Sequence, residues 1–595
     1  MVIFEPMQEP SSFYAESLKR YIRNYGNLKK RLRIVSFSRL LAFLFALLCI
    51  YFFRNNLPLA LVFSITGMAL FLFLVRHYED VKTKFRFVVA MIKVNETELR
   101  VLRHQFDDLP EGKNYDDAQH AYCQDLDLFG AGSFFQYLNR THLFEGSAFL
   151  AKMLKDNGIE RIIDKQEAIA TLAKKPEWSQ HFRAHASLVQ YETKISEVVA
   201  WLEAYKPFVP KTMRVFPWVF LIGFVTVAVS TYFLQWSLVY VLLWLLSGLT
   251  FTGGYFARIR QLALKADRIK ATFKQHSELL DLVENTVFET SLLEEERHRL
   301  IGRGIKASKA IGQFSRLLNT MDYNNNIFFA IFGNGCFLGA LLTAYHIEAW
   351  IKAHKSDVEV WFGVIAFFEA YTSLGNFAYN HSNYTYPEIG KGNNVLDCTQ
   401  LGHPLIPEAK NIKNDFAIGP SDFFIITGSN MAGKSTFLRS VGLCMVMANL
   451  GLPVHADRCV YQPHRLVTSM RTVDSLQKGD SYFLSELKRL QMIVQLLESG
   501  PYFVLLDEIL KGTNSTDKAV GSKKFLARLL RTKAIGLIAT HDLSLCETAE
   551  DYPTVFNYHL DATIADGELS FDYLLKKGVS RTMNASFLLE KMDLI

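Results

Sequence analysis

The sequence predicts an α/β P-loop domain at the C-terminal end of the chain, preceded by an all-α region that carries two transmembrane helical hairpins. A glycine-containing loop with the spacing of a phosphate-binding site follows a short apolar run from Phe423 to Thr427. Two pairs of apolar runs of bilayer length lie upstream, among long charged stretches with few Gly or Pro residues. From about Tyr384 onward, short β-like runs alternate with helical patterns, which is typical of α/β folds.

The composition supports a chain of mixed character. Its 595 residues are 50% hydrophobic and 21% charged, a balance that indicates a soluble part diluted by membrane segments. The net charge of +6 permits an anionic partner without requiring one, because membrane flanks also produce a basic balance. The seven cysteines are scattered and no pair has CxxC spacing, so the pattern indicates neither a zinc site nor a disulfide framework.

The apolar runs predict the membrane segments. The first hairpin comprises residues 34–53 and 57–75, and the second comprises residues 215–234 and 236–256. Buried core helices are the alternative, but core helices seldom extend for about 20 apolar residues without a polar face. Lys and Arg residues flank both hairpins, and positive residues stay on the cytoplasmic side. We therefore expect a multi-pass protein of the lipid bilayer whose N-terminus, lever region and C-terminal domain are cytoplasmic.

These segments divide the chain into six consecutive parts. They are a basic cytoplasmic arm (1–33), the first hairpin (34–75), the first part of a helical core (76–214), the second hairpin (215–256), lever helices with the second part of the core (257–383), and the α/β domain (384–595).

A complete P-loop pattern, Gly-x-x-x-x-Gly-Lys-Ser, lies between an apolar run and a helical pattern. Its glycines let the backbone turn tightly and aim N–H groups at phosphate oxygens, and the following helix N-terminus adds partial positive charge. We expect Lys434 to bind the β- and γ-phosphates of ATP and Ser435 to coordinate Mg²⁺. The predicted nucleotide-binding residues are Gly428, Ser429, Asn430, Met431, Ala432, Gly433, Lys434, Ser435 and Thr436.

Two further apolar runs end in polar pairs that suit the same chemistry. YFVLLDE ends in Asp507, which would hold Mg²⁺ through water, and Glu508, which would polarise the attacking water. AIGLIAT is followed by His541, which is expected to sense the γ-phosphate or orient the water at the ligand edge of the sheet. The alternatives are that these polar pairs only cap a strand end or a helix.

These stretches, in this order, resemble the MutS family of DNA mismatch-repair ATPases. TGSNMAGKST is similar to the family's loop through the pair Asn430-Met431, with Ser429 in place of the usual proline. DSYFLSEL resembles the signature Ser-Thr-Phe-Met-x-Glu, with Ser481 as the matching serine, although a helix cap is an alternative reading. LLDEILKGTNSTD and ATHD resemble two more family motifs, and Leu126–Leu154 and Phe367–Ile389 resemble parts of its helical core.

The resemblance implies an ABC-like ATPase fold and a homodimer in which Ser481 faces the nucleotide of the partner subunit. It also implies lever helices that connect the ATPase to a clamp around DNA. This sequence departs from that plan, because no domain-sized segment remains for the N-terminal mismatch reader. The second hairpin lies roughly where the family inserts its clamp, so we expect membrane helices to replace the clamp.

Three functions remain open at this point. The first is a membrane-anchored, MutS-like ATPase dimer that also engages DNA through basic helix residues such as Arg297 and Arg299. The alternative for these residues is an ordinary solvent-exposed helix face. The second is a MutS-like ATPase that drives a membrane event or acts on an unknown protein partner without binding DNA. The third, an ABC-type transporter, is less favoured because four spans are few for a transport pathway and no acidic relay residue occurs in them.

Overall fold

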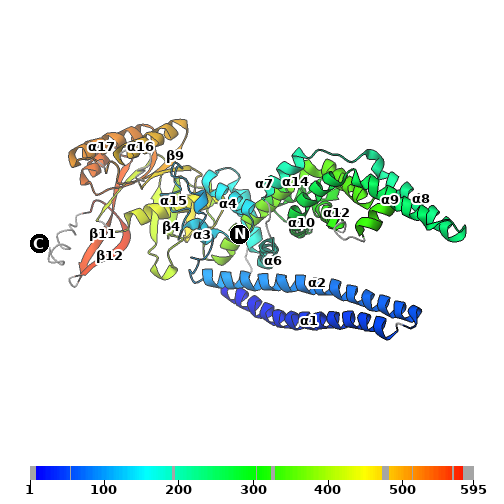
Figure 1. The fold of residues 1–595 in the computed structure, drawn as a ribbon. Helices are drawn as coiled ribbons and strands as arrows, with labels where there is room; N and C mark the ends of the chain where they lie inside the picture. Colours follow the sequence, from blue (N-terminus) through cyan, green and yellow to red (C-terminus); the bar gives the residue numbers. More distant parts are fainter. Residues whose placement is uncertain are drawn as a thin grey trace. The chain divides into compact units, whose positions relative to one another are not determined.

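A computed structural model describes residues 9–53, 55–189, 194–302, 304–322, 329–429, 431–471, 482–511, 513–565 and 568–580 (Figure 1). The chain forms two compact units. Unit 1 comprises Met1–Leu99, Thr141–Gly146 and Glu177–Glu369, and unit 2 comprises Arg100–Arg140, Ser147–Pro176 and Ala370–Ile595. The sequence-based prediction of a largely helical region followed by an α/β domain is confirmed at this level.

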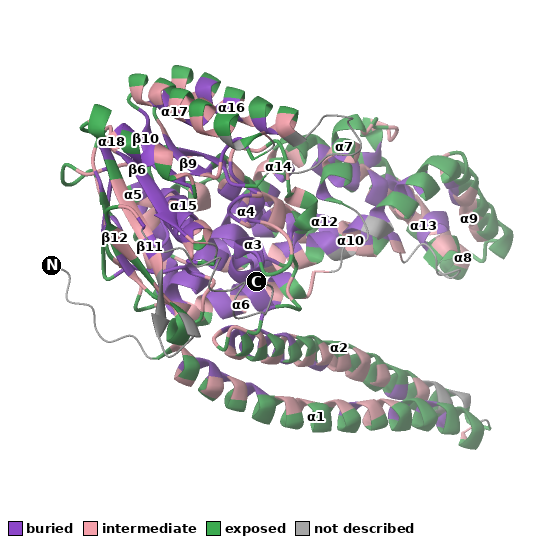
Figure 2. Cartoon of the chain, turned by 90° about the vertical axis from the view of Figure 1, so that its left-hand side faces the viewer, coloured by how far each residue is buried: buried purple, intermediate pink, exposed green. Residues whose placement is uncertain are grey.

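Unit 1 begins with two long helices that lie side by side, α1 (Pro10–Phe52) and α2 (Leu57–Val101). Gly67 permits their close approach, since a Cβ at this position would lie 3.0 Å from the Cβ of Ala46. At the other end of the pair, Tyr21 and Met91 join a small apolar cluster with Ala184. Much of the outer surface of both helices is exposed, although it is rich in large apolar side chains (Figure 2).

The rest of unit 1 is built from helices that pack through aromatic rings. Phe273 and Phe314 have ring centroids 5.0 Å apart, and Trp350 stacks on Phe314 at 4.0 Å. These contacts join three helices, because the residues belong to α10, α12 and α14 respectively. The elements are α6 (Pro176–Ser187), α7 (Ile195–Ala204), η2 (Lys211–Arg214), α8 (Phe216–Phe233), α9 (Leu238–Gly253), α10 (Phe256–Glu284), α11 (Ser291–His298), β1 (Ile301–Gly302), β2 (Ile305–Lys306), α12 (Ala307–Asp322), η4 (Phe329–Gly333), α13 (Asn334–Phe337) and α14 (Gly339–Asn380), which continues into unit 2.

Three helices of the described chain are long and apolar enough to cross a membrane: Pro10–Phe52, Val62–Val101 and Phe216–Phe233. Two bent pairs also meet this criterion when each pair is taken together. Leu238–Gly253 and Phe256–Ala266 meet at 66°, and Phe329–Phe337 and Gly339–Asn380 meet at 78°. The pair that begins at Phe329 falls outside both predicted hairpins, so the sequence analysis missed an apolar segment.

Unit 2 is organised around a six-stranded sheet with the order β12-β11-β6-β10-β9-β8, in which only the β11–β12 pair is antiparallel. The central strands β6 and β10 are buried along their whole length, as expected for parallel strands that are covered on both faces. The strands are β6 (Phe423–Gly428), β8 (Arg465–Ser469), β9 (Tyr502–Asp507), β10 (Ile535–Ala539), β11 (Val555–Ala565) and β12 (Glu568–Lys577).

Helices cover both faces of this sheet. On one face, Val504 and Leu506 pack in a cluster with Leu490 of α16 (Tyr482–Ser499) and Leu526 of α17 (Ser515–Arg531). On the other face, Gly442 of α15 (Lys434–Leu450) lies against the side chain of Leu505. Because β6, β8, β9 and β10 are parallel, their carboxyl ends lie at one edge of the sheet, where the loops carry the polar residues.

A second, four-stranded sheet in unit 2 has the order β3-β7-β4-β5. Its strands are β3 (Glu388–Ile389), β4 (Leu396–Leu401), β5 (Asn414–Ile418) and β7 (Arg458–Tyr461). The remaining short elements of this unit are η1 (Lys113–Tyr115), α3 (Phe134–Leu138), α4 (Phe144–Asp156, which begins in unit 1), α5 (Ile162–Ala173), η5 (Glu408–Lys410), η6 (Leu543–Glu547) and α18 (Thr548–Asp551).

Candidate nucleotide-binding site

The loop between β6 and α15 depends on two glycines. Gly428 has a φ of 148°, and a Cβ there would lie 2.2 Å from the backbone oxygen of Leu560 on the neighbouring strand. Gly433 has a φ of 93°, and a Cβ there would lie 2.9 Å from the ring of Tyr573. Both positions therefore require glycine, for backbone conformation and for space. The loop delivers the chain into the N-terminus of α15, where backbone N–H groups are free to bind an anion.

Lys434 folds back over this loop. Its Nζ donates to the backbone oxygens of Gly428 and Ser429, both at 2.9 Å, and lies 3.2 Å from Nε2 of His541. The residue is only 6% exposed, and burial lowers the pKa of its amine while the nearby Asp507 and Glu508 act in the opposite direction. Lys434 therefore holds a buried cationic centre at the mouth of the loop, as a phosphate-binding lysine must.

Ser435 and Asp507 form the second pair of the site. The Ser435 hydroxyl donates to Oδ2 of Asp507 at 2.5 Å, which joins the first turn of α15 to the carboxyl end of β9. A hydroxyl and a carboxylate oxygen at this separation are hard donors of the kind that Mg²⁺ prefers. The donor set therefore fits the magnesium ion that an ATP site would require.

Glu508 and His541 form the third pair. Oε1 of Glu508 lies 2.8 Å from Nε2 of His541, so the residues that follow β9 and β10 meet across the edge of the sheet. The hydrogen bond from His541 lowers the pKa of Glu508 to about 2, and the charges of His541 and Lys511 add to this effect. Glu508 is therefore a carboxylate at neutral pH, and its φ of 50° is unusual for a non-glycine residue.

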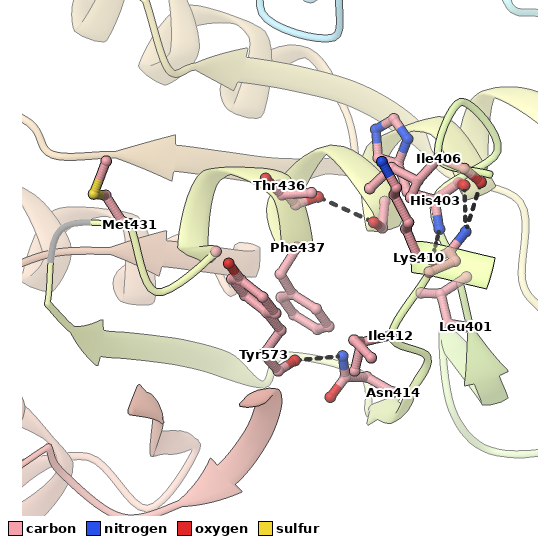
Figure 3. Close-up of a pocket in the computed structure, with 13 residues that line it drawn as sticks. Leu401, His403, Ile406, Lys410, Ile412, Asn414, Met431, Thr436, Phe437 and Tyr573 are labelled. Carbon is pink, nitrogen blue, oxygen red and sulfur yellow. Dashed lines mark hydrogen bonds between the residues drawn. The ribbon is translucent and has the colours of Figure 1, made fainter. Parts of the chain in front are cut away.

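A cavity of about 360 Å³ adjoins the loop at Gly433 (Figure 3). Tyr573 of β12 and Phe437 of α15 supply aromatic wall, and Leu401 and Ile412 supply aliphatic wall. Asn414 links β5 to β12, because its Nδ2 donates to the backbone oxygen of Tyr573 at 3.1 Å. A pocket that combines aromatic and aliphatic walls with polar groups such as Lys410 and Asn411, beside a phosphate-binding loop, suits a flat heterocyclic base. The sequence analysis missed these residues, since they share no motif and meet only when β5, β12 and α15 assemble.

Glu486 supports the loop that follows β9. This buried carboxylate accepts a hydrogen bond from the backbone N–H of Leu510 at 2.5 Å, and the N–H of Lys511 lies 3.4 Å from the same oxygen. Leu510 has a φ of 61°, so the carboxylate holds a loop with an uncommon backbone conformation next to Glu508. Glu486 lies in the second turn of α16 and makes its contacts with another segment, which is a positioning role.

Residues 424–590 match the family model of MutS domain V. The C-terminal segment of the chain is therefore a MutS domain V. This result confirms the resemblance inferred from the P-loop and the three motifs that follow it. The residues that the site brings together, from Lys434 to His541, all lie within the matched segment.

Curated relatives carry MutS names as well. The human MutS protein homolog 4 is 32% identical over 215 residues, which cover 34% of this chain and 22% of the relative. The Arabidopsis thaliana DNA mismatch repair protein MSH4 is 30% identical over 217 residues, or 35% of this chain and 27% of the relative. The Desulfatibacillum aliphaticivorans DNA mismatch repair protein MutS is 30% identical over 225 residues, which cover 36% of this chain and 25% of the relative. The chain thus spans about a quarter of the length of these relatives.

Two residues that resemble MutS signatures, Asn430 and Ser481, lie outside the described residues. Of the other predicted loop residues, Met431 has a φ of 69° and its side chain is 80% exposed, whereas Ala432 is buried. Thr436 follows Ser435 on α15 and lines the cavity. The resemblance of Leu126–Leu154 and Phe367–Ile389 to the helical core of MutS proteins stays a prediction, because the family model matches only the C-terminal segment.

Proposed function

We propose that this MutS-family chain is an ATPase that binds Mg²⁺ and ATP at the edge of the six-stranded sheet and hydrolyses the nucleotide. One observation carries the proposal: three elements bring Lys434, the Ser435–Asp507 pair and the Glu508–His541 pair together beside a pocket with aromatic walls. A phosphate-binding lysine, two hard oxygen donors and an ionised carboxylate are the groups that phosphoryl transfer to water requires.

Each group has a distinct task in this mechanism. The loop N–H groups and Lys434 bind the phosphate chain, and the lysine exchanges the backbone oxygens of Gly428 and Ser429 for phosphate oxygens. Ser435 and Asp507 would hold Mg²⁺, which would supply positive charge to neutralise the phosphate oxygens. Glu508 accepts a hydrogen bond from the attacking water and orients its oxygen toward the γ-phosphorus, while the bond from that phosphorus to the bridging oxygen breaks. His541 holds Glu508 in place until substrate arrives.

Nucleotide binding tests this assignment directly. We expect the full chain, purified in detergent, to bind a fluorescent ATP analogue in the presence of Mg²⁺ and to release phosphate from ATP. Lys434→Ala should abolish binding, whereas Lys523→Ala, which removes an exposed lysine paired with Glu547, should leave binding unchanged. Equal affinity of the Lys434→Ala and wild-type proteins would contradict the proposal.

We also propose that unit 1 anchors the protein in a lipid bilayer. Helices α8 and α9 expose large apolar side chains along most of their length, among them Trp218, Ile222 and Leu242. α13 packs closely on α9, since a Cβ at Gly248 would lie 2.6 Å from the backbone oxygen of Gly335. Close approach through glycine is a common device of membrane helices. The η4 segment beside these helices exposes Ile331 and Phe332, which supports a further membrane-embedded segment next to α8 and α9.

Extraction tests the anchor. We expect the expressed chain to stay in the membrane pellet after washing with alkaline carbonate and to enter solution only with detergent. Release by carbonate alone would contradict the membrane assignment without affecting the ATPase proposal.

DNA engagement is the less supported part of the function. The names of the relatives refer to DNA mismatch repair, yet two of the basic residues that suggested DNA contacts, Arg297 and Arg299, pair with nearby carboxylates. Arg297 binds Glu294, and Arg299 binds Glu296 at 2.8 Å. This pairing favours the alternative in which the ATPase drives a membrane event or a protein partner. Salt-dependent binding of the purified chain to duplex DNA decides between them, since no affinity at low salt would exclude the DNA role.

A MutS-like ATPase is also expected to form a homodimer that completes its sites with Ser481 of the partner subunit. We expect ATP to shift the mass of the detergent-solubilised chain from monomer to dimer, most clearly in Glu508→Gln, which should retain the nucleotide. A mass that does not respond to ATP would contradict this part of the proposal.

A further inference from the structure

Three buried cysteines meet in unit 2, away from the residues discussed so far. Cys398 lies on β4, Cys444 on α15 and Cys459 on β7, and none is more than 2% exposed. Their Sγ atoms all lie within 4.8 Å of one another. Cys398 Sγ is 3.3 Å from Cys459 Sγ and 4.0 Å from Cys444 Sγ.

The fold itself produces this cluster. β4 and β7 are antiparallel, and Cys398 and Cys459 are direct partners in their register, which puts both side chains on the same face of the sheet. α15 then brings Cys444 against that face. The three thiols therefore converge from three rigid elements, which is the arrangement that a preformed ligand site requires.

We propose that the three thiols form a binding site for one thiophilic metal ion and that Cu⁺ is the ion it suits. Three sulfurs at about 2.3 Å from one ion in a common plane lie roughly 4 Å apart, so the observed spacing needs little change on binding. In the described part of the chain, no fourth His, Cys, Asp or Glu completes the group. Thiolates bind both Zn²⁺ and Cu⁺, but structural Zn²⁺ sites use four ligands. A site of three thiolates therefore suits Cu⁺ better.

Binding of the ion changes the charge and the protonation of the three thiols. Each thiol that binds the ion releases its proton to solvent, and the positive charge of Cu⁺ offsets part of the resulting thiolate charge. Burial otherwise makes such charge costly, and the bound ion offsets part of that cost. Binding is therefore expected to weaken as the pH falls, because protons compete with the ion for the sulfurs.

Two other uses of the cluster are possible outcomes of the test. Buried thiols can act only as small apolar side chains. Cys398 and Cys459 can instead form a disulfide, which would remove two protons and two electrons to an external oxidant and consume two of the three ligands. All three residues are free thiols in the structure.

The site is separate from the nucleotide site. Cys444 follows Lys434 by ten residues on α15, which corresponds to about 15 Å along a helix. The ion would tie α15 to the β4–β7 pair, so its expected effect is on the stability of unit 2. The proposal therefore does not depend on the ATPase assignment.

Competition with a chromophoric chelator tests the site. The full chain, reduced and kept free of oxygen in detergent, is titrated into the Cu⁺–bicinchoninate complex, and the loss of the complex colour reports transfer. We expect the wild type to take one equivalent of Cu⁺ and to gain near-ultraviolet thiolate-to-copper absorption. Cys398→Ala and Cys459→Ala should each weaken uptake by about 100-fold or more. Cys546→Ala, which removes a buried cysteine outside the cluster, should bind like the wild type.

Other results of the same titration would contradict the Cu⁺ site. Equal uptake by Cys398→Ala and Cys546→Ala would overturn the site, as would binding of Zn²⁺ but not Cu⁺. An unreduced protein that lacks two hydrogens by mass spectrometry and takes no copper after reduction would assign the cluster to a disulfide. Cys398→Ser serves as a second variant if the alanine variants lose their thermal transition, and the same loss of uptake is expected from it.

Discussion

Glu508 and His541, which follow two neighbouring strands, share a 2.8 Å contact, and Lys434 lies 3.2 Å from the same histidine nitrogen. The contact links the cation of the phosphate-binding loop to the carboxylate assigned to the attacking water. His541 therefore has a structural task before any nucleotide binds, in addition to the γ-phosphate sensing predicted from its position after β10. That sensing role stays a prediction.

The first prediction concerns Glu508→Gln. The amide keeps the shape of the side chain but removes the charge that orients water, so we expect kcat to fall by roughly 10²- to 10⁴-fold while ATP still binds. Phosphate release and equilibrium binding of labelled ATP measure the two effects separately. Glu498→Gln, in an exposed pair with Arg528, is the matched control and should behave like the wild type. Normal turnover by Glu508→Gln would show that another group orients the water.

The second prediction concerns the pH dependence of stability. The pKa of Glu508 is lowered from an ordinary 4.5 to about 2, so its ionised form stabilises the folded state above pH 4.5, and this contribution is lost as the pH falls from 4.5 toward 2. Because this carboxylate is partly exposed, solvent screening reduces its contribution below the roughly 3 kcal/mol that a shift of this size represents. We expect the wild type to have a higher apparent Tm than Glu508→Gln near neutral pH, and the difference to shrink at about pH 3. A difference that does not change with pH would argue against the lowered pKa.

The third prediction concerns the two loop glycines. Gly428→Ala would force a Cβ to within 2.2 Å of a backbone oxygen, so we expect a lower apparent Tm together with loss of nucleotide binding. Gly433→Ala would meet the ring of Tyr573, which can shift, so we expect a smaller loss of stability but weaker binding. Gly500→Ala, where a Cβ meets nothing within 4 Å, is the control and should change neither quantity.

The fourth prediction separates the base pocket from the phosphate loop. Tyr573→Ala removes an aromatic wall, and we expect the affinity for ATP to fall by roughly 10-fold, the loss of about one stacking contact. Affinity for inorganic tripolyphosphate, which lacks a base, should stay the same. Equal weakening for both ligands would mean that Tyr573 acts through Gly433 and the loop.

The fifth prediction concerns Glu486 as a positioning residue. Glu486→Gln weakens the acceptor for the Leu510 N–H, so we expect slower ATP turnover at nearly unchanged ATP affinity, because the loop beside Glu508 is less well held. Glu547→Gln, an exposed partner of Lys523, is the control. A loss of affinity as large as the loss of turnover would indicate a general folding defect.

Local patterns were sufficient for part of this molecule. The P-loop spacing, the strand that ends in Asp507 and the strand before His541 identify their elements from a few adjacent residues, and the match to MutS domain V confirms the resemblance to which they point. The long apolar runs likewise coincide with helices α1, α2, α8 and α9. In each case the signal is contiguous in sequence.

Features made by distant segments escaped the sequence analysis. The base pocket needs Leu401, Phe437 and Tyr573 from three elements, and the thiol cluster needs cysteines 46 and 61 residues apart. A rule based on CxxC spacing cannot detect ligands that meet through strand register. The η4–α13 segment was missed because its apolar run is short and is broken at Leu338, which has a φ of 54°.

The position of Lys434 affects product release from the proposed site. Its ammonium group is bound by two backbone oxygens of its own loop, at the same 2.9 Å that a phosphate oxygen would offer. When a product leaves, the lysine can transfer to these oxygens and is never left as a buried charge without a partner. If the site binds ATP as proposed, the loop competes with the nucleotide for a single cation, and we expect this internal competition to favour exchange of ADP over tight retention.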